Sequence, residues 1–66
     1  MIDETAAVIK IVKAADMAIA YGDFNHARAI QFELSASSLL GAAIGAWIIG
    51  EEIGRAEAAL GLKVAA

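Results

Sequence analysis

The sequence predicts an all-α protein in which a helical hairpin associates into a helical bundle. Alanine, the strongest helix former, supplies seventeen of the 66 residues, no proline interrupts the chain, and no segment alternates as a strand would. Residues 1–66 are expected to form a single helical domain, which alone buries only about 60% of its unfolded surface. Because cysteine is absent, association with other chains is the expected source of further stability.

The first helix is predicted over residues 3–21, where apolar side chains recur at helical spacing along one face. Ile9 and Met17 lie on the opposite, polar side, which leaves room for a second contact surface. The residues of the apolar face are Val8, Ile11, Val12, Ala15, Ala18 and Ile19.

A tight turn is predicted at residues 21–23, directly after this helix. Gly22 can adopt the left-handed conformation that ends a helix, and Asp23 can cap the amide groups that open the next one. Asn25 is a competing cap for the second helix.

The second helix is predicted over about residues 24–60, either continuous or bent near Gly41 to Gly45. Gly61, followed by the apolar Leu62, suits a C-terminal cap. At 1.5 Å per residue the first helix is about 28 Å long and the second about 55 Å. About half of the second helix therefore has no expected neighbour within the chain and should pack against another one.

The predicted interface lies in that half, which is rich in large apolar residues. Burial of six such side chains contributes about 9–18 kcal/mol, at 1.5–3 kcal/mol each, whereas association costs about 4–15 kcal/mol. Gly41 and Gly45 form a GxxxG pattern that allows two helices to approach closely. The interface residues are Leu39, Leu40, Gly41, Ile44, Gly45, Trp47, Ile48 and Ile53.

An uncharged segment, residues 34–50, raises the alternative of a single membrane span. Its seventeen residues would reach only about 25 Å as a helix, against about 30 Å for the hydrocarbon core. Lys and Arg are nearly balanced on its two sides, three before and two after, so no orientation is indicated. A small membrane protein, such as a phage lysis factor or a small subunit of a membrane complex, is thus the second hypothesis.

Gly22, Phe24 and Ala27 follow one another through the predicted turn, and Ala15 is a small residue in the helix before it. Residues 15–34 thus resemble a tetratricopeptide repeat, whose turn carries Gly, an aromatic residue and a small residue in this order and whose first helix has a small residue at the place of Ala15. Gln31 stands where that family has an aromatic residue. The resemblance implies a helical hairpin that docks onto other helices.

Residues that could carry chemistry are few. His26 is the single histidine, cysteine is absent, and adjacent Glu51 and Glu52 point about 100° apart on a helix. We therefore expect no enzymatic activity, no cofactor and no metal site.

The expected partners follow from the charge pattern. A net charge of −3 with scattered basic residues argues against nucleic acid, and the acidic start of the chain argues against a secretory signal. The sequence thus predicts a cytoplasmic assembly or adaptor protein, a bacterial or phage accessory protein in type, that forms a homo-oligomer or docks on another helical protein.

Overall fold

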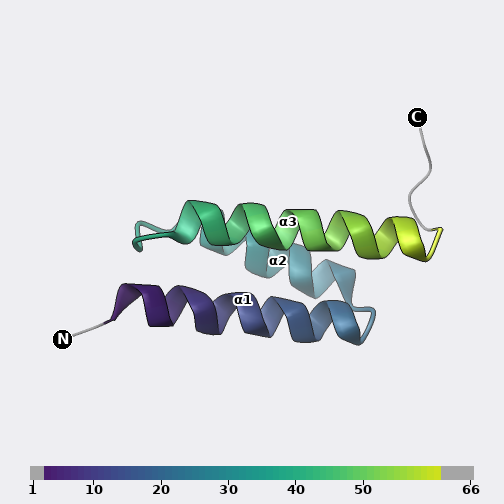
Figure 1. Ribbon diagram of the computed structural model, residues 1–66, viewed down its shortest axis with the longest axis horizontal. Helices are drawn as coiled ribbons and strands as arrows, with labels where there is room; N and C mark the ends of the chain where they lie inside the picture. Colours follow the sequence, from purple (N-terminus) through teal and green to yellow (C-terminus); the bar gives the residue numbers. More distant parts are fainter. Residues whose placement is uncertain (1–2, 62–66) are drawn as a thin grey trace.

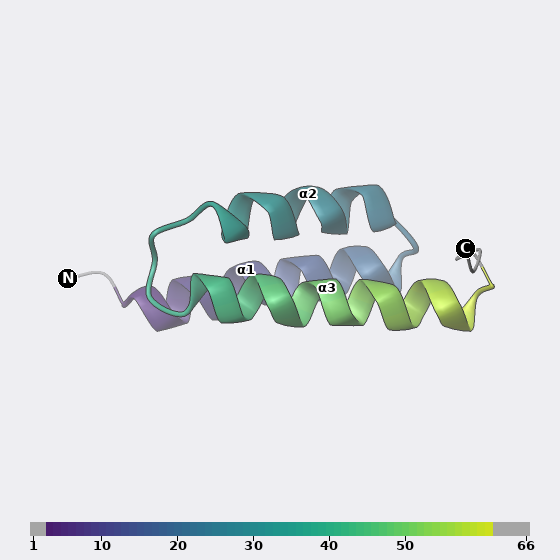
Figure 2. The same cartoon turned by 90° about the horizontal axis from the view of Figure 1, so that it is seen from above.

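The fold is a bundle of three α-helices, so the all-α class predicted from the sequence is confirmed. The computed structural model describes residues 3–61 and contains α1 (Glu4–Ala20), α2 (Phe24–Ser35) and α3 (Ala42–Ala59). Each helix packs against the other two. α1 and α3 run in the same direction, and α2 runs in the opposite direction along one side of that pair (Figures 1 and 2).

The predicted turn between the first two helices is confirmed. Gly22 adopts the left-handed conformation with a φ of 78°. The Asp23 carboxylate accepts a hydrogen bond of 3.1 Å from the backbone N–H of His26, so Asp23 caps α2 and Asn25 does not. Asp3 caps α1 in the same way.

The predicted second helix is divided into two by a connection of residues 36–41. The hydroxyl of Ser35 donates a hydrogen bond of 2.7 Å to the carbonyl oxygen of Phe32, and that of Ser37 accepts one of 3.1 Å from the N–H of Leu39. Such local hydrogen bonds compete with those of a continuing helix. The expectation of one long helix, continuous or bent, is therefore corrected to two helices.

α3 returns along α1, and a hydrogen bond ties the connection to the start of the chain. The N–H of Leu40 donates a hydrogen bond of 3.0 Å to the carboxylate of Glu4, and Gly41, with a φ of 84°, opens α3. The second half of the chain thus has neighbours within its own chain, contrary to the expectation from helix lengths.

The end of α3 has the predicted glycine. Gly61 is left-handed, with a φ of 71°, and its N–H donates a hydrogen bond of 3.1 Å to the carbonyl of Ala58. Leu62, predicted to make the accompanying apolar contact, lies outside the described residues.

The core lies along the common axis of the three helices. Its largest fully buried side chains are Leu34 of α2 and Ile49 and Ile53 of α3. Small residues complete it and let the helices approach one another. The buried hydrophobic residues are Val8, Ala15, Ala18, Ala27, Leu34, Ala42, Ala46, Ile49 and Ile53.

Gly45 of α3 lies where side chains of α1 and α2 pack against it. A Cβ atom there would lie 2.9 Å from Cδ2 of Leu34 and 3.0 Å from Cγ1 of Val8, closer than carbon atoms pack. The predicted role of Gly41 and Gly45 in close helix approach thus holds for Gly45 within the chain, whereas Gly41 belongs to the turn.

The segment proposed as a membrane span is not a continuous helix. Residues 34–50 include the end of α2, the whole connection and the first half of α3. Among residues 3–61, no helix combines the length and apolarity needed to cross a bilayer.

Candidate functional site

The eight predicted interface residues separate into two groups in the structure. Ile53 is fully buried, Gly45 is buried and Leu39 is half-buried against the core, so these three serve the fold of the chain itself. Gly41 is exposed at the start of α3. The four with large exposed side chains are Leu40, Ile44, Trp47 and Ile48, with exposed fractions of 70%, 66%, 66% and 39%.

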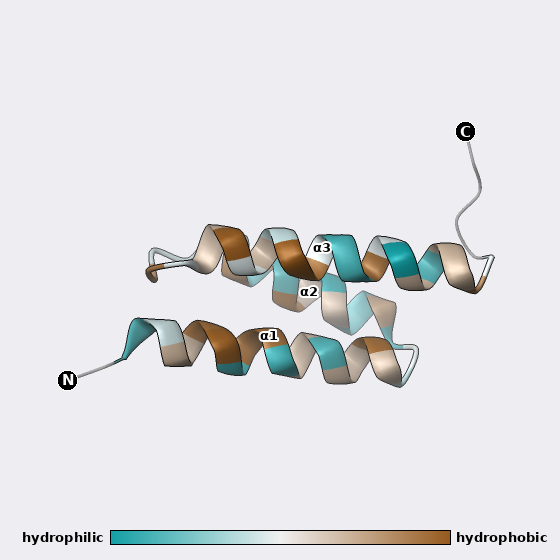
Figure 3. Cartoon of the chain, in the orientation of Figure 1, coloured by the Kyte–Doolittle hydropathy of each residue, from teal (hydrophilic) through white to brown (hydrophobic). Residues whose placement is uncertain are grey.

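Leu40, Ile44 and Ile48 share a surface with Ile9, which is 50% exposed on α1, and Trp47 adjoins this surface on α3. Ile44, Trp47 and Ile48 lie three or four residues apart and are neighbours on the surface of α3. Figure 3 shows that strongly hydrophobic residues gather in the halves of α1 and α3 nearest their N-termini, while hydrophilic residues follow in α3. We call Ile9, Leu40, Ile44, Trp47 and Ile48 the apolar face.

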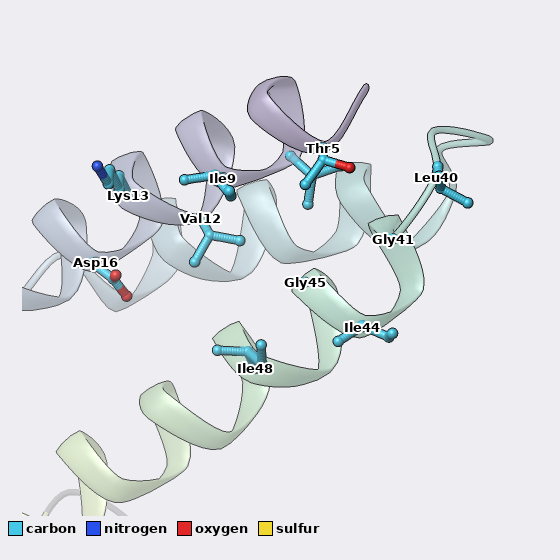
Figure 4. A pocket seen from close by; sticks show the side chains of 11 residues that line it. Thr5, Ile9, Val12, Lys13, Asp16, Leu40, Gly41, Ile44, Gly45 and Ile48 are labelled. Atoms are coloured by element: carbon cyan, nitrogen blue, oxygen red, sulfur yellow. The ribbon is translucent and has the colours of Figure 1, made fainter. Parts of the chain in front are cut away.

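A groove between α1 and α3 is lined by four residues of the apolar face, and the fifth, Trp47, lies outside it. Its volume is about 420 Å³. Thr5 and Leu40 lie at one end and Asp16 at the other, with Val12 and Ile48 on opposite sides between them (Figure 4). The groove residues are Thr5, Val8, Ile9, Val12, Lys13, Asp16, Leu40, Gly41, Ile44, Gly45 and Ile48.

The α1 side of the groove was not predicted as part of the interface. The one residue in the sequence that indicated a second contact surface on this helix was Ile9, an apolar residue on its polar side. Val8, Val12 and Asp16 join the groove only because α3 folds back beside α1, which the assumed long helix did not allow.

Two carboxyl groups meet at one end of the groove, Asp16 on α1 and Glu52 on α3. Hydrogen bonding with the Asp16 carboxyl raises the pKa of Glu52 above its ordinary value of 4.5, as do burial and repulsion by the Asp16 charge, while Arg55 opposes the shift. Oδ1 of Asp16 and Oε1 of Glu52 are buried without a hydrogen-bond partner. The two groups can hydrogen-bond only while one of them is protonated, because two ionised carboxylates offer no donor.

No cation of the described chain pairs with these carboxylates. Lys13 lines the same groove, but within residues 3–61 the ion pair joins Arg28 of α2 to Glu57 of α3, at 2.5 Å. The far end of the groove is also acidic, because the Glu4 carboxylate accepts the N–H of Leu40 there. Carboxylates thus lie at or beside both ends of the groove, whose own charged lining residues are Asp16 and Lys13.

The other residues considered for chemistry are scattered. His26 is exposed at the start of α2. Among residues 3–61, no group of three or more His, Cys, Asp or Glu side chains is placed to hold a metal ion.

Comparisons with protein-family models, with curated proteins and with solved structures find no match. The residues that resemble a tetratricopeptide repeat do form a hairpin in which Ala15 and Ala27 are fully buried and Phe24 packs against the core. The resemblance therefore describes the local geometry of α1 and α2.

The exposed area of the apolar face sets the energy scale of an interaction. Together, the exposed fractions of its five side chains equal about three fully exposed side chains. Burying that area would contribute about 4–9 kcal/mol, at 1.5–3 kcal/mol for each side chain. Association costs about 4–15 kcal/mol. The face alone therefore roughly balances this cost, and tight binding requires further contacts from the partner.

Proposed function

We propose that this protein is a small, non-enzymatic assembly or adaptor protein whose groove binds an α-helix of a partner protein. The single observation that carries the proposal is the groove between two parallel helices, lined by aliphatic side chains that the chain leaves exposed. Exposed apolar patches of this kind are typical of interaction sites. An amphipathic helix laid into an apolar groove is a recurring mode of protein recognition.

The fold itself supports a helix as the ligand. α2 packs against both α1 and α3 on one side of that pair (Figure 2), and the groove opens on the other side (Figure 4). A helix in the groove would give α1 and α3 neighbours on both sides, as in a four-helix bundle. A second copy of this chain is the other partner that the sequence allowed.

A neutral helical peptide tests the proposal. The groove spans Thr5 to Asp16 of α1, so a peptide of about 15 residues, with leucines three and four apart, glutamines elsewhere and no Trp, is long enough. Trp47, the chain's single Trp, is 66% exposed and lies outside the groove but three residues from Ile44, which lines it, so Trp fluorescence is the first measure of binding and calorimetry the second. Because the leucines of the peptide add their own burial to that of the apolar face, we expect a dissociation constant in the micromolar range, about −7 to −8 kcal/mol.

Two matched variants locate the binding site. Ile44→Ser removes an aliphatic side chain from the groove and should weaken binding about tenfold. Phe32→Ser removes a side chain that is 76% exposed on α2, outside the groove, and should leave binding unchanged. Absence of peptide binding, or equal losses in both variants, would contradict the proposed function.

A further inference from the structure

The two ends of the groove indicate the chemistry of its ligand. Its middle is aliphatic, whereas Asp16 and Glu52 lie at one end and Glu4 at the other. Charged groups at the edges of an interface select the partner by complementary charge and by repulsion of wrong partners.

A second copy of this chain fits these ends poorly. Most homodimers have a two-fold axis. An axis perpendicular to the groove brings the Glu4 end of one copy to the Asp16 and Glu52 end of the other. An axis along the groove brings like ends together, so carboxylates meet carboxylates in both arrangements. Lys13 is the single cationic residue that lines the groove, and each copy carries a net charge of −3.

A cation from the ligand offsets the negative charge of this pair. The carboxyl groups of Asp16 and Glu52 repel one another when both are ionised, and an ammonium or guanidinium group placed against them removes that repulsion and supplies hydrogen-bond donors. A charged hydrogen bond to a carboxylate is among the stronger contacts in proteins. It would add the polar contact that the apolar face lacks.

We infer that the groove binds an amphipathic helix of a different protein, with an apolar stripe that ends in a Lys or Arg placed against Asp16 and Glu52. This inference rests on the proposed function and specifies the partner's charge. The groove is about 17 Å long, so the cation lies about three turns from the first apolar residue of the stripe.

Charge variants of the neutral peptide test the inference. In the first set of peptides, one terminal Gln, four residues beyond the last leucine, is replaced by Lys or by Glu. A second set carries the same replacements at the other end of the peptide, because the helix can dock in either direction. In the set that matches the docking direction, we expect Lys to tighten binding about tenfold over Gln and Glu to weaken it about tenfold. High salt should reduce both differences.

Variants of the protein assign the effect to the two carboxyl groups. The double variant Asp16→Asn, Glu52→Gln should bind the Lys and Gln peptides equally. Glu51→Gln removes the same type of charge from the exposed neighbour of Glu52 and should keep the preference for Lys. Both variants retain the side-chain volume, and Trp47 fluorescence reports binding in each.

The outcomes separate this inference from the proposed function. Equal binding of the Lys, Gln and Glu peptides by the wild-type protein would overturn the inference and leave the helix-binding function standing. No binding of any peptide would overturn both. Self-association in sedimentation that Ile44→Ser abolishes and Phe32→Ser does not would identify a second copy as the ligand and overturn the inference.

Discussion

The two sides of α3 differ in how completely the chain covers them. Ile49 and Ile53 face the core and are fully buried, whereas Ile44 and Ile48, on the same helix, are 66% and 39% exposed. Both sides are aliphatic, so hydropathy alone does not distinguish them. The difference arises from α2, which packs on one side of the α1 and α3 pair and leaves the groove on the other (Figures 2 and 4). The chain thus uses one side of α3 to form its core and leaves the other side exposed to solvent.

The largest expected effect is a loss of fold stability when an isoleucine on the core side of α3 is replaced by alanine. The same replacement on the groove side is the comparison. Ile53→Ala should destabilise the fold by about 2–5 kcal/mol, because it leaves a cavity in a fully packed site. The whole free energy of unfolding of such a chain is about 3–10 kcal/mol. Ile44→Ala, on the exposed side, should change it by less than about 0.5 kcal/mol. Urea denaturation followed by circular dichroism measures both, and equal losses would show that the groove side also belongs to the core.

An intermediate effect is expected at two glycines of α3. Gly45→Ala places a Cβ atom 2.9 Å from Leu34 and 3.0 Å from Val8, and this overpacking should outweigh the gain in helix propensity by about 1–2 kcal/mol. Gly54→Ala meets nothing within 4 Å and should stabilise the fold by about 0.5–1 kcal/mol. Thermal unfolding midpoints should therefore move in opposite directions. A rise in both would mean that the helices separate easily at Gly45.

The features predicted correctly from the sequence are those set by local chemistry. The all-α class, the left-handed Gly22 and the capping role of Asp23 depend on residues close together in the chain. The exposure of Ile44 and Trp47 agrees with an excess of apolar residues over what one short helix pair can cover, while their role in an interface stays a prediction.

The features that were missed depend on contacts between distant residues. The connection at residues 36–41 contains no proline to mark the break in the helix. Its glycine, Gly41, cannot be told in the sequence from the glycines that remain within α3. The return of α3 along α1 depends chiefly on burial of Ile49 and Ile53 in the shared core, and the hydrogen bond from Leu40 to Glu4, 36 residues away, adds to it. The pairing of Asp16 with Glu52 has the same origin. Neither contact can be inferred before the return of α3 is known.

The smallest expected effect is a pH dependence at Glu52, on the groove side. Because its pKa is raised in the folded chain, the fold binds this proton more tightly than the unfolded chain does. The resulting stabilisation is complete below the ordinary value of 4.5 and is lost as the pH rises through the raised value. Glu52→Gln should therefore raise the urea midpoint at about pH 7 and leave it unchanged at about pH 3.5.

Glu51→Gln is the control for the net charge, because it removes a carboxylate from the neighbouring exposed position. An equal gain in the two variants, or a gain for Glu52→Gln at low pH, would show that the local contact with Asp16 is not the cause. If only Glu52→Gln gains at neutral pH, the groove side of the bundle carries a repulsion that the core side lacks. A cationic ligand would remove that repulsion, so the cost to the free fold and the preference for such a ligand would have one physical origin.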